Sequence, residues 1–376
     1  MQNRAIITVL DSINPTTMPY NEFVLYRNSH YKNEKQILLL TGSEIIIPQE
    51  DIPPNLEIHK VGKNPFKICS ELKRIIFECV NINIKYIIHL HSIRGSFSTF
   101  IAMFLGKISK KHTIYTIHST FTGFKIHNKL LTCLNSLFSN YVTCVSKTAY
   151  NYFPKVIREI KKDKIKYIQN SVNTERIDST LTDYKVVKNN DFIYFSFIAR
   201  MVPIKNHKFL INVLKQCAAN IKFIFIGAED KNGSIRKYAE EQGVLDKIEF
   251  TGLIPREEVY KKIADSDFYI SSSTLEGLPV SALEAMYCGK PTILSSIPQH
   301  KEIADVCSAV QLLPLDTETW TKAINKYSLL SKQERYKRGL SCKSCAYEFF
   351  SLKKMHEKYD EIYEKINKTE TNLSCL

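Results

Sequence analysis

The feature that most constrains this chain is a repeated alternation of short apolar runs with amphipathic helical stripes. The runs are rich in β-branched residues, and each is continuously apolar rather than alternating with polar positions. Such runs are typical of parallel strands that helices cover on both faces. The first series comprises residues 5–10, 36–41, 86–90, 113–117, 141–145 and 166–168. The pattern predicts an α/β fold with doubly wound topology.

A second series of strands and helices begins after a polar stretch, residues 171–191, which has no clear period and is predicted to be a linker. Strands are expected at 192–199, 222–227, 247–250, 268–271, 292–295 and 309–312. Helices are expected at about 207–217, 234–242, 257–264 and 279–288, and throughout the chain after 317. A chain of 376 residues is long enough for two cores. We therefore expect two Rossmann-like domains, 1–170 and 192–345, facing a cleft, and a final helical segment, 346–376.

Positive charge is concentrated in the first half of the chain. Residues 1–170 hold 23 basic and 11 acidic residues, whereas residues 171–376 hold 29 and 27. From Cys79 to Arg158, both included, there are ten Lys or Arg residues and no Asp or Glu. Such a field attracts anionic lipid, nucleic acid or a polyanionic substrate. The alternative interpretation is a surface that is charged only for solubility.

One helical stripe in this basic region predicts an anionic membrane surface as a partner. Its apolar positions 97, 100, 101, 104 and 105 are flanked by Arg94, Lys107, Lys110 and Lys111, as in an interfacial helix. A core helix packed on the sheet is the alternative. No apolar run approaches the length of a membrane span, and residues 5–10 are too short for a signal sequence. We expect a cytoplasmic protein, peripheral on the inner face of the membrane, whose cysteines are free thiols.

The most informative segment, residues 271–294, has the form of a strand end, a loop and a helix. Pro279 suits the first helical position, and Gly289 suits the helix end. The amides of Gly277, Leu278 and Val280 then lie at a helix N-terminus, which favours phosphate binding. The segment therefore predicts an anion site.

Two acids flank this helix N-terminus, and two cations lie in another loop. Glu276 and Glu284 suit hydroxyl groups, one of a sugar and one of a ribose, so the segment indicates a nucleotide sugar. Arg200 and Lys205 follow the strand expected at 192–199, where they can neutralise a diphosphate. Asp265-Ser-Asp267 has the spelling of a metal-binding motif, but it precedes a strand, so we interpret it as a surface pair at a helix end. No metal and no other cofactor is expected.

These residues resemble glycosyltransferase family 4, the retaining, GT-B-fold members of the group 1 glycosyl transferases. The similarity is strong over residues 140–305 and rests on blocks that occur in order at the family's spacing. The blocks are Arg200…Lys205, Phe225-Ile-Gly227, Phe250-Thr-Gly252-Leu253, 267–272, Glu276-Gly-Leu-Pro279 with Glu284, and 285–291.

The resemblance implies a role for each matching residue. Arg200 and Lys205 would hold the diphosphate, and Glu276 would hold the donor sugar with Pro279 and the amides of Gly277, Leu278 and Val280. Glu284 would bind the ribose, and Leu253 would flank the base. His118 resembles the histidine of the family's N-terminal pocket, whereas His89 and His91 are weaker candidates. The N-terminal domain would be the acceptor side, and the segment 346–376 would pack back on it.

The chain departs from the family pattern at three places. Ala199 and Asn206 replace glycines, and the loop 11–19 lacks the usual glycines. The function implied is transfer of a hexose-type sugar, without a metal, from a nucleotide diphosphate to a saccharide or lipid-linked acceptor, in surface polysaccharide or glycolipid assembly. The alternatives are a nucleotide-sugar 2-epimerase of the same fold and a basic nucleic-acid-binding protein. No nucleic acid is expected as a partner, because no motif beyond charge supports it.

Overall fold

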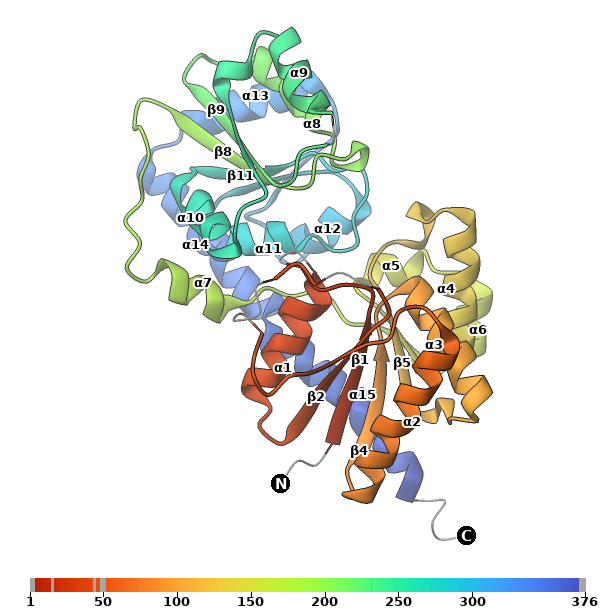
Figure 1. The fold of residues 1–376 in the computed structure, drawn as a ribbon. Helices are drawn as coiled ribbons and strands as arrows, with labels where there is room; N and C mark the ends of the chain where they lie inside the picture. Colours follow the sequence, from red (N-terminus) through yellow and green to blue (C-terminus); the bar gives the residue numbers. More distant parts are fainter. Residues whose placement is uncertain (1–3, 15–16, 43–44, 48–51, 231, 372–376) are drawn as a thin grey trace. The chain divides into compact units, whose positions relative to one another are not determined.

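The computed structural model describes residues 4–14, 17–42, 45–47, 52–230 and 232–371. They belong to two compact units, which are described separately (Figure 1). Unit 1 comprises residues 1–169 and 353–376, and unit 2 comprises residues 170–352. Within the described residues, none of the helices combines the length and apolarity needed to cross a membrane.

Unit 1 is built on a seven-stranded parallel sheet in the order β3-β2-β1-β4-β5-β6-β7. Its strands are β1 (Arg4–Leu10), β2 (Glu34–Leu40), β3 (Glu57–Lys60), β4 (Lys85–Leu90), β5 (Thr113–Ile117), β6 (Tyr141–Cys144) and β7 (Ile165–Tyr167). Its α-helices are α1 (Leu25–His30), α2 (Pro65–Asn81), α3 (Ile93–Gly106), α4 (Ile126–Phe138), α5 (Lys147–Asn151), α6 (Lys155–Lys161) and α15 (Leu352–Thr371). Shorter helical turns are η1 (Pro19–Val24), η3 (Lys110–His112), η4 (Phe121–Gly123) and η5 (Lys162–Lys164).

Six of these strands were expected from the apolar runs, and β3 was not. β3 is an edge strand whose four residues are all at least partly exposed. An edge strand buries little side-chain surface, so its sequence carries no continuous apolar run. The pairing of β3 with β2 is a long-range contact that a local pattern does not encode.

Unit 2 contains a six-stranded parallel sheet in the order β10-β9-β8-β11-β12-β13. Its strands are β8 (Ile193–Ile198), β9 (Ile221–Ile226), β10 (Ile248–Gly252), β11 (Phe268–Ser271), β12 (Thr292–Ser295) and β13 (Gln311–Leu313). Its α-helices are α7 (Thr174–Leu181), α8 (His207–Lys215), α9 (Ser234–Glu241), α10 (Arg256–Asp265), α11 (Val280–Tyr287), α12 (Pro298–Ala304), α13 (Thr317–Ser328) and α14 (Lys332–Phe350). Two turns of 3₁₀-helix are η6 (Pro203–Lys205) and η7 (Leu245–Lys247). The predicted doubly wound parallel α/β architecture is thus present in both units.

The stretch predicted to be a linker, 171–191, is instead part of unit 2 and contains a helix, so the prediction of a linker is wrong. Residues Thr174–Leu181 form α7, which begins where the Asn173 side chain accepts a hydrogen bond from the amide of Arg176. Only Ile177 of this helix is buried. A single buried position gives no apolar period, so the helix escaped the sequence analysis.

The C-terminal limit of unit 2 also differs from the expected residue 345. Helix α14 continues to Phe350, whose side chain is 1% exposed in the core of unit 2. The chain then pairs Ser351 with Val172, and α15 follows at once. The boundary therefore lies at residues 352 and 353, where the chain passes from the core of unit 2 to that of unit 1.

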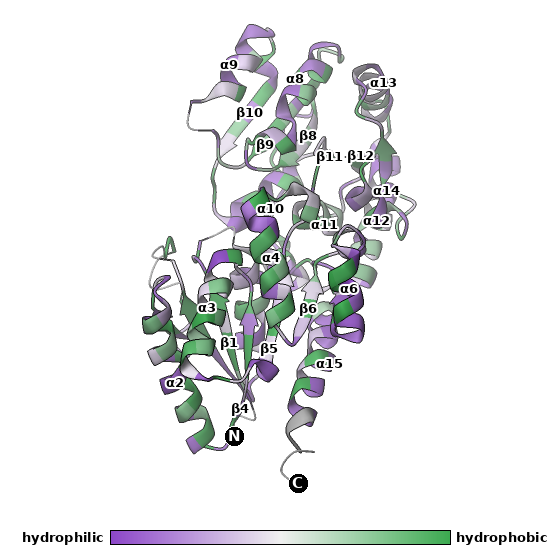
Figure 2. Ribbon diagram, turned by 90° about the vertical axis from the view of Figure 1, so that its right-hand side faces the viewer, coloured by the Kyte–Doolittle hydropathy of each residue, from purple (hydrophilic) through white to green (hydrophobic). Residues whose placement is uncertain are grey.

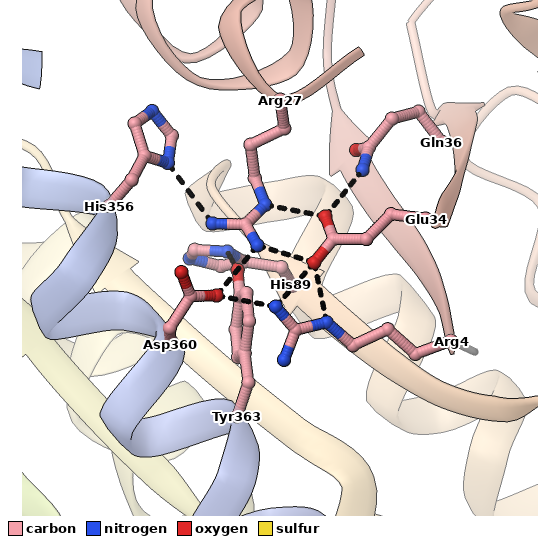
Figure 3. Close-up of polar contacts among 8 residues, drawn as sticks. All are labelled: Arg4, Arg27, Glu34, Gln36, His89, His356, Asp360 and Tyr363. Atoms are coloured by element: carbon pink, nitrogen blue, oxygen red, sulfur yellow. Dashed lines mark hydrogen bonds and ion pairs between the residues drawn. The ribbon is translucent and has the colours of Figure 1, made fainter. Parts of the chain in front are cut away.

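A buried ionic cluster fastens α15 to the sheet of unit 1 (Figure 3). Arg27, which is fully buried, donates from Nη2 to Glu34 Oε1 at 2.5 Å and to Asp360 Oδ1 at 2.7 Å. Its Nη1 lies 3.2 Å from His356 Nδ1, and His356 Nε2 lies 3.1 Å from the Glu22 carbonyl oxygen. The contacts made by His356 and Asp360 join residues more than 300 positions apart in the sequence.

Candidate active site

The site in unit 2 lies at the carboxyl ends of two neighbouring parallel strands, β8 and β11. Hydrogen bonds join the loops that follow them. The amide of Thr274 donates to the Ile204 carbonyl oxygen at 2.8 Å, and Ser272 Oγ lies 3.1 Å from the carbonyl oxygens of both Lys205 and Asn206. These hydrogen bonds hold the segment with the predicted cations against the segment with Glu276. Ligands of open α/β sheets bind at this edge, the carboxyl ends of the strands.

Asn206, which stands where the family pattern has glycine, has the left-handed backbone conformation, with φ of 57°. Asparagine tolerates this conformation better than most residues because its short polar side chain can bond locally. The substitution therefore keeps the backbone path of the loop. Gly227 is not replaceable in this way: its φ is 143°, and a Cβ atom would lie 2.4 Å from the Ala199 carbonyl oxygen.

Lys205 and Glu276 meet directly, with Nζ 2.5 Å from Oε1. Their side chains are 19% and 10% exposed, so the pair is partly shielded yet open to solvent. Arg200, in the same loop as Lys205, is exposed. The structure thus brings a cation and a carboxylate of the predicted site into contact. A ligand can replace this ion pair by offering an anionic group to Lys205 and hydroxyl groups to Glu276. Lys205 has three hydrogen-bond donors for this purpose, and Glu276 has several acceptor positions.

The N-terminus of α11 follows Glu276 within four residues. Pro279 is the N-cap, with φ of −74° and ψ of 103°, and not the first helical residue. The helix therefore begins one residue later than predicted, at Val280. The first hydrogen bonds to the Pro279 carbonyl oxygen come from the amides of Ala282 and Leu283, at 3.1 and 3.4 Å. The amides before them precede the helical ladder and carry the positive end of the helix dipole. Gly277 and Val280 are partly exposed at this end, whereas Leu278 is packed in the core.

Glu284, predicted to bind a ribose, is 1% exposed. Its Oε1 lies 2.8 Å from Arg256 Nη2 and accepts a hydrogen bond from the Tyr260 hydroxyl at 3.1 Å. Arg176 Nε in turn donates to the Tyr260 hydroxyl at 2.9 Å. The carboxylate therefore belongs to a structural network as well as to the predicted site. Contact with a ribose would require Arg256 to share it, and the ribose role remains a prediction.

Arg256, Tyr260 and Arg176 were not identified from the sequence. The two from α10 lie in a helix that the analysis predicted but did not connect with Glu284, and Arg176 lies in the stretch taken as a linker. Only the tertiary packing of α7, α10 and α11 brings the three side chains to one carboxylate. Leu253, predicted to flank the base, is 58% exposed just after β10.

In unit 1, the predicted pocket histidine, His118, is half-buried at the end of β5. Its Nε2 lies 2.9 Å from Nδ1 of His91, which is buried at the end of β4. Burial lowers the pKa of His118 to about 4. Burial and the nearby His89 and His118 hold the pKa of His91 well below its usual value. Both rings are therefore neutral near pH 7 and can each donate and accept one hydrogen bond.

His89 is fully buried and serves the packing of α15 rather than a pocket. One ring nitrogen lies 2.7 Å from the Tyr363 hydroxyl, and the other lies 2.7 Å from Thr116 Oγ1. The His89 ring also stacks on His91 at a centroid distance of 3.9 Å. Of the three histidines considered, His91 and His118 stand together, and His89 links them to the C-terminal helix.

The interpretation of Asp265 and Asp267 as a surface pair is wrong, because both side chains are buried. Asp265 accepts hydrogen bonds from the Tyr184 hydroxyl and the Val187 amide, and Asp267 forms ion pairs with Lys188 and Arg335. These contacts tie the 182–192 segment and α14 to the start of β11. Among the residues that the structure describes, no group of three or more His, Cys, Asp or Glu side chains is arranged to hold a metal ion.

Comparison with known proteins bears directly on this site. The sequence profile described as "Glycosyl transferases group 1" matches residues 179–338, which include all the predicted residues of unit 2. The capsular polysaccharide biosynthesis glycosyltransferase CapH of Staphylococcus aureus is 26% identical over 283 residues, which cover 72% of this chain and 74% of CapH.

Two solved structures share the architecture. A glycosyltransferase from Rickettsia africae ESF-5 aligns with a TM-score of 0.76 and 19% identity, covering 98% of this chain and 100% of that one. HepE from Anabaena, solved in complex with UDP and glucose, aligns with a TM-score of 0.73 and 17% identity, covering 96% and 100%. At these identities the likeness establishes the fold, which is the predicted GT-B pair of parallel α/β units.

Proposed function

We propose that this chain, whose residues 179–338 match the group 1 glycosyl transferases, moves a hexose-type sugar, with retention of configuration, from a nucleotide diphosphate to a saccharide or lipid-linked acceptor. The observation that carries this proposal is the pairing of Lys205 with Glu276 beside the N-terminus of α11. A donor of this kind offers phosphate oxygens to the cation and amides, and sugar hydroxyls to the carboxylate.

The proposed roles follow from charge development during transfer. As the glycosidic bond breaks, its electron pair leaves with the diphosphate, which gains negative charge. Lys205 and Arg200 stabilise that charge, and the amides at the start of α11 add to it. The acceptor oxygen approaches the same face of the sugar and gives its proton to the departing phosphate oxygen. Because the cations and the helix supply positive charge, the reaction needs no divalent metal.

The remaining residues position the donor. Glu276 holds hydroxyls of the transferred sugar, and Glu284, once Arg256 shares it, holds the ribose. Leu253 lies beside the base, and neutral His118 of unit 1 can donate or accept one hydrogen bond to a saccharide. UDP-glucose is the first donor to test, because HepE was solved with UDP and glucose. Capsular or other surface polysaccharide and glycolipid assembly is the proposed setting, in line with CapH.

The test begins with donor binding. Thermal shifts are measured with UDP, GDP and ADP and with their glucose or mannose conjugates, because a ligand of the folded state raises its melting temperature. The donor that gives the largest shift then enters a transfer assay with oligosaccharide and polyprenyl-diphosphate-linked acceptors. The anomeric configuration of the product is assigned by NMR. Inversion would contradict the proposed retention.

Glu276→Gln tests the site itself. The variant is expected to lose about 30- to 1000-fold in rate, the effect of losing about 2–4 kcal/mol of transition-state stabilisation. Glu241→Gln, at an exposed carboxylate of α9, is the control and should match the wild type. If Glu276→Gln retains the wild-type rate, the site has been misassigned. Sugar isomerisation without any acceptor would instead identify a 2-epimerase.

A further inference from the structure

Unit 1 exposes large apolar side chains on a face that carries only positive charge. We define the α3–α4 face by Ile101, Phe104 and Leu105 of α3 and by Ile126, Leu130 and Phe138 of α4. Their exposed fractions range from 37% for Ile101 to 84% for Phe104. Figure 2 shows the hydrophobic colour along both helices. An apolar patch of this kind on a folded unit marks an interaction site rather than core.

The face is hollowed between the two helices. Phe97, Phe100 and Phe104 from α3, with Leu134 and Phe138 from α4, line a groove of about 570 Å³. Its floor is packed, because Phe100 is 7% exposed, and its rim is open at Phe104. Helix α3 is thus a core helix on one side and an exposed apolar surface on the other. The core-helix alternative is therefore correct for the packed side of α3, and the interfacial alternative stays a prediction for its exposed side.

Cations surround this groove. Lys107, Lys110 and Lys111 lie at the C-terminal end of α3 and are exposed, and Lys110 also lines the groove. Arg94 and Lys125 are exposed at the other ends of the two helices. The sequence contains no acidic residue between Cys79 and Arg158, so neither α3, α4 nor the segment that joins them carries a carboxylate.

We propose that the α3–α4 face docks on an anionic lipid surface and that its groove receives acyl chains of the lipids. An anionic bilayer offers negative headgroups to the lysines and hydrocarbon to Phe104 and its neighbours, so it complements both properties of the face at once. A second copy of this chain would bring like charges together. A nucleic acid would complement the lysines but leave the phenylalanines in contact with a polar backbone.

Docking goes beyond sugar transfer, and it is tested without donor or acceptor. Flotation is measured with vesicles of phosphatidylcholine alone and of phosphatidylcholine with 30% phosphatidylglycerol, an amount on the order of that used to mimic anionic membranes. Recovery with the anionic vesicles is expected to exceed recovery with the neutral ones at least tenfold at low salt. It should fall as salt screens the lysines. Equal recovery with both vesicles would overturn the proposal.

Two variants separate the apolar from the electrostatic part. Phe104→Ser should lower anionic-vesicle binding about tenfold without changing the melting temperature, because the ring is 84% exposed. Lys107→Glu with Lys110→Glu should lower it at least as much. Leu329→Ser and Lys237→Glu are matched controls on exposed residues of unit 2 and should leave binding unchanged. Equal losses in the controls would contradict a localised docking face.

Insertion into the bilayer is measured with Phe104→Trp. The chain has a single tryptophan, Trp320, which is fully buried, so the new fluorescence reports on position 104. We expect a blue shift on addition of anionic vesicles and quenching by brominated acyl chains. An unchanged spectrum during flotation would overturn the acyl-chain groove. A dimer in solution that Phe104→Ser dissociates, or duplex DNA that binds more tightly than vesicles, would assign the face to another partner.

Discussion

The two units have the same layered architecture but place their polar chemistry differently. Unit 2 gathers Lys205, Glu276 and the start of α11 in two loops at the ends of adjacent strands. Unit 1 buries its polar groups, above all Arg27 and the linked histidines, beneath the C-terminal helix, and it exposes apolar and basic residues on α3 and α4. A binding site held by loops leaves a local sequence pattern, whereas a network between distant segments does not.

The largest expected difference between the two units is in acid stability: lowering the pH should destabilise unit 1 more than unit 2. Burial lowers the pKa of four described histidines in unit 1 and of two in unit 2: His89, His91, His118 and His356, and His207 and His300. In the unfolded chain these rings bind protons near pH 6.5, but in the folded chain the pKa of His118, His207 and His300 is about 4, and burial holds the pKa of the other three rings well below its usual value. The stability from keeping them neutral is thus complete above pH 6.5 and is lost as pH falls. Each histidine contributes up to about 1.4 kcal/mol per pH unit.

Hydrogen exchange at pH 7.5, 6.5 and 5.5, corrected for intrinsic rates, measures this prediction. Peptides from β4, β5 and α15 are expected to lose protection before peptides from β8 and β11. Earlier loss in unit 2 would contradict the assignment of the acid-sensitive groups to unit 1.

Arg27→Leu should destabilise unit 1 by up to about 3–5 kcal/mol, because it removes a fully buried cation that binds both Glu34 and Asp360 and leaves the Glu34 carboxylate with only Arg4 and Gln36 as partners. The matched control is Arg74→Leu, which removes an exposed arginine paired with Glu71 and should change stability by less than about 1 kcal/mol. Denaturant unfolding gives both values. The double variant with Glu34→Leu should recover part of the loss, and an additive loss would argue against a coupled network.

Lys205→Ala and Arg200→Ala should each lower the rate by about 30- to 1000-fold, or about 2–4 kcal/mol, through the charge that develops on the diphosphate. Glu284→Gln should act mainly on KM for the donor, because a ribose contact changes little as the bond breaks. Steady-state kinetics separate the two effects. Lys208→Ala, an exposed neighbour on α8, is the control. Rates near wild type for both cation variants would show that the catalytic site has been wrongly assigned to this part of unit 2.

Asp265→Ala should destabilise unit 2 by about 1–3 kcal/mol, because the Tyr184 hydroxyl and the Val187 amide lose a charged acceptor. Asp246→Ala, at an exposed position, should stay within about 0.5 kcal/mol of the wild type. The comparison is made by chemical denaturation. Equal stability of the two variants would mean that the buried contacts of Asp265 do not stabilise unit 2.

Removal of divalent metal should have the smallest effect. With Lys205, Arg200 and the start of α11 supplying positive charge, EDTA is expected to leave turnover within a few-fold of its value in magnesium. The measurement is an initial rate with and without EDTA. Complete loss that magnesium or manganese restores would mean that a metal neutralises the diphosphate in place of these residues.

Sequence reasoning located the strands and the loops of unit 2 because both are local patterns. Phe268–Ser271 and Thr292–Ser295 are strands at the predicted residues, since each is a short apolar run in a fully buried position. The burial of Glu284, Asp265 and Asp267 was missed, because it depends on arginines, lysines and tyrosines brought by other helices. Edge strand β3 and helix α7 were missed because neither buries a repeating set of side chains.

The assignment of α15 to unit 1 bears on the order of events during synthesis. Unit 2 is one continuous stretch, residues 170–352, so its whole sequence leaves the ribosome before α15 does. Until then Arg27 lacks its partners Asp360 and His356, and the sheet of unit 1 lacks the helix that bonds to His89. The first half of the chain is therefore made first and completed last. A nascent chain truncated before residue 353 should be sensitive to protease in unit 1 while unit 2 is already resistant.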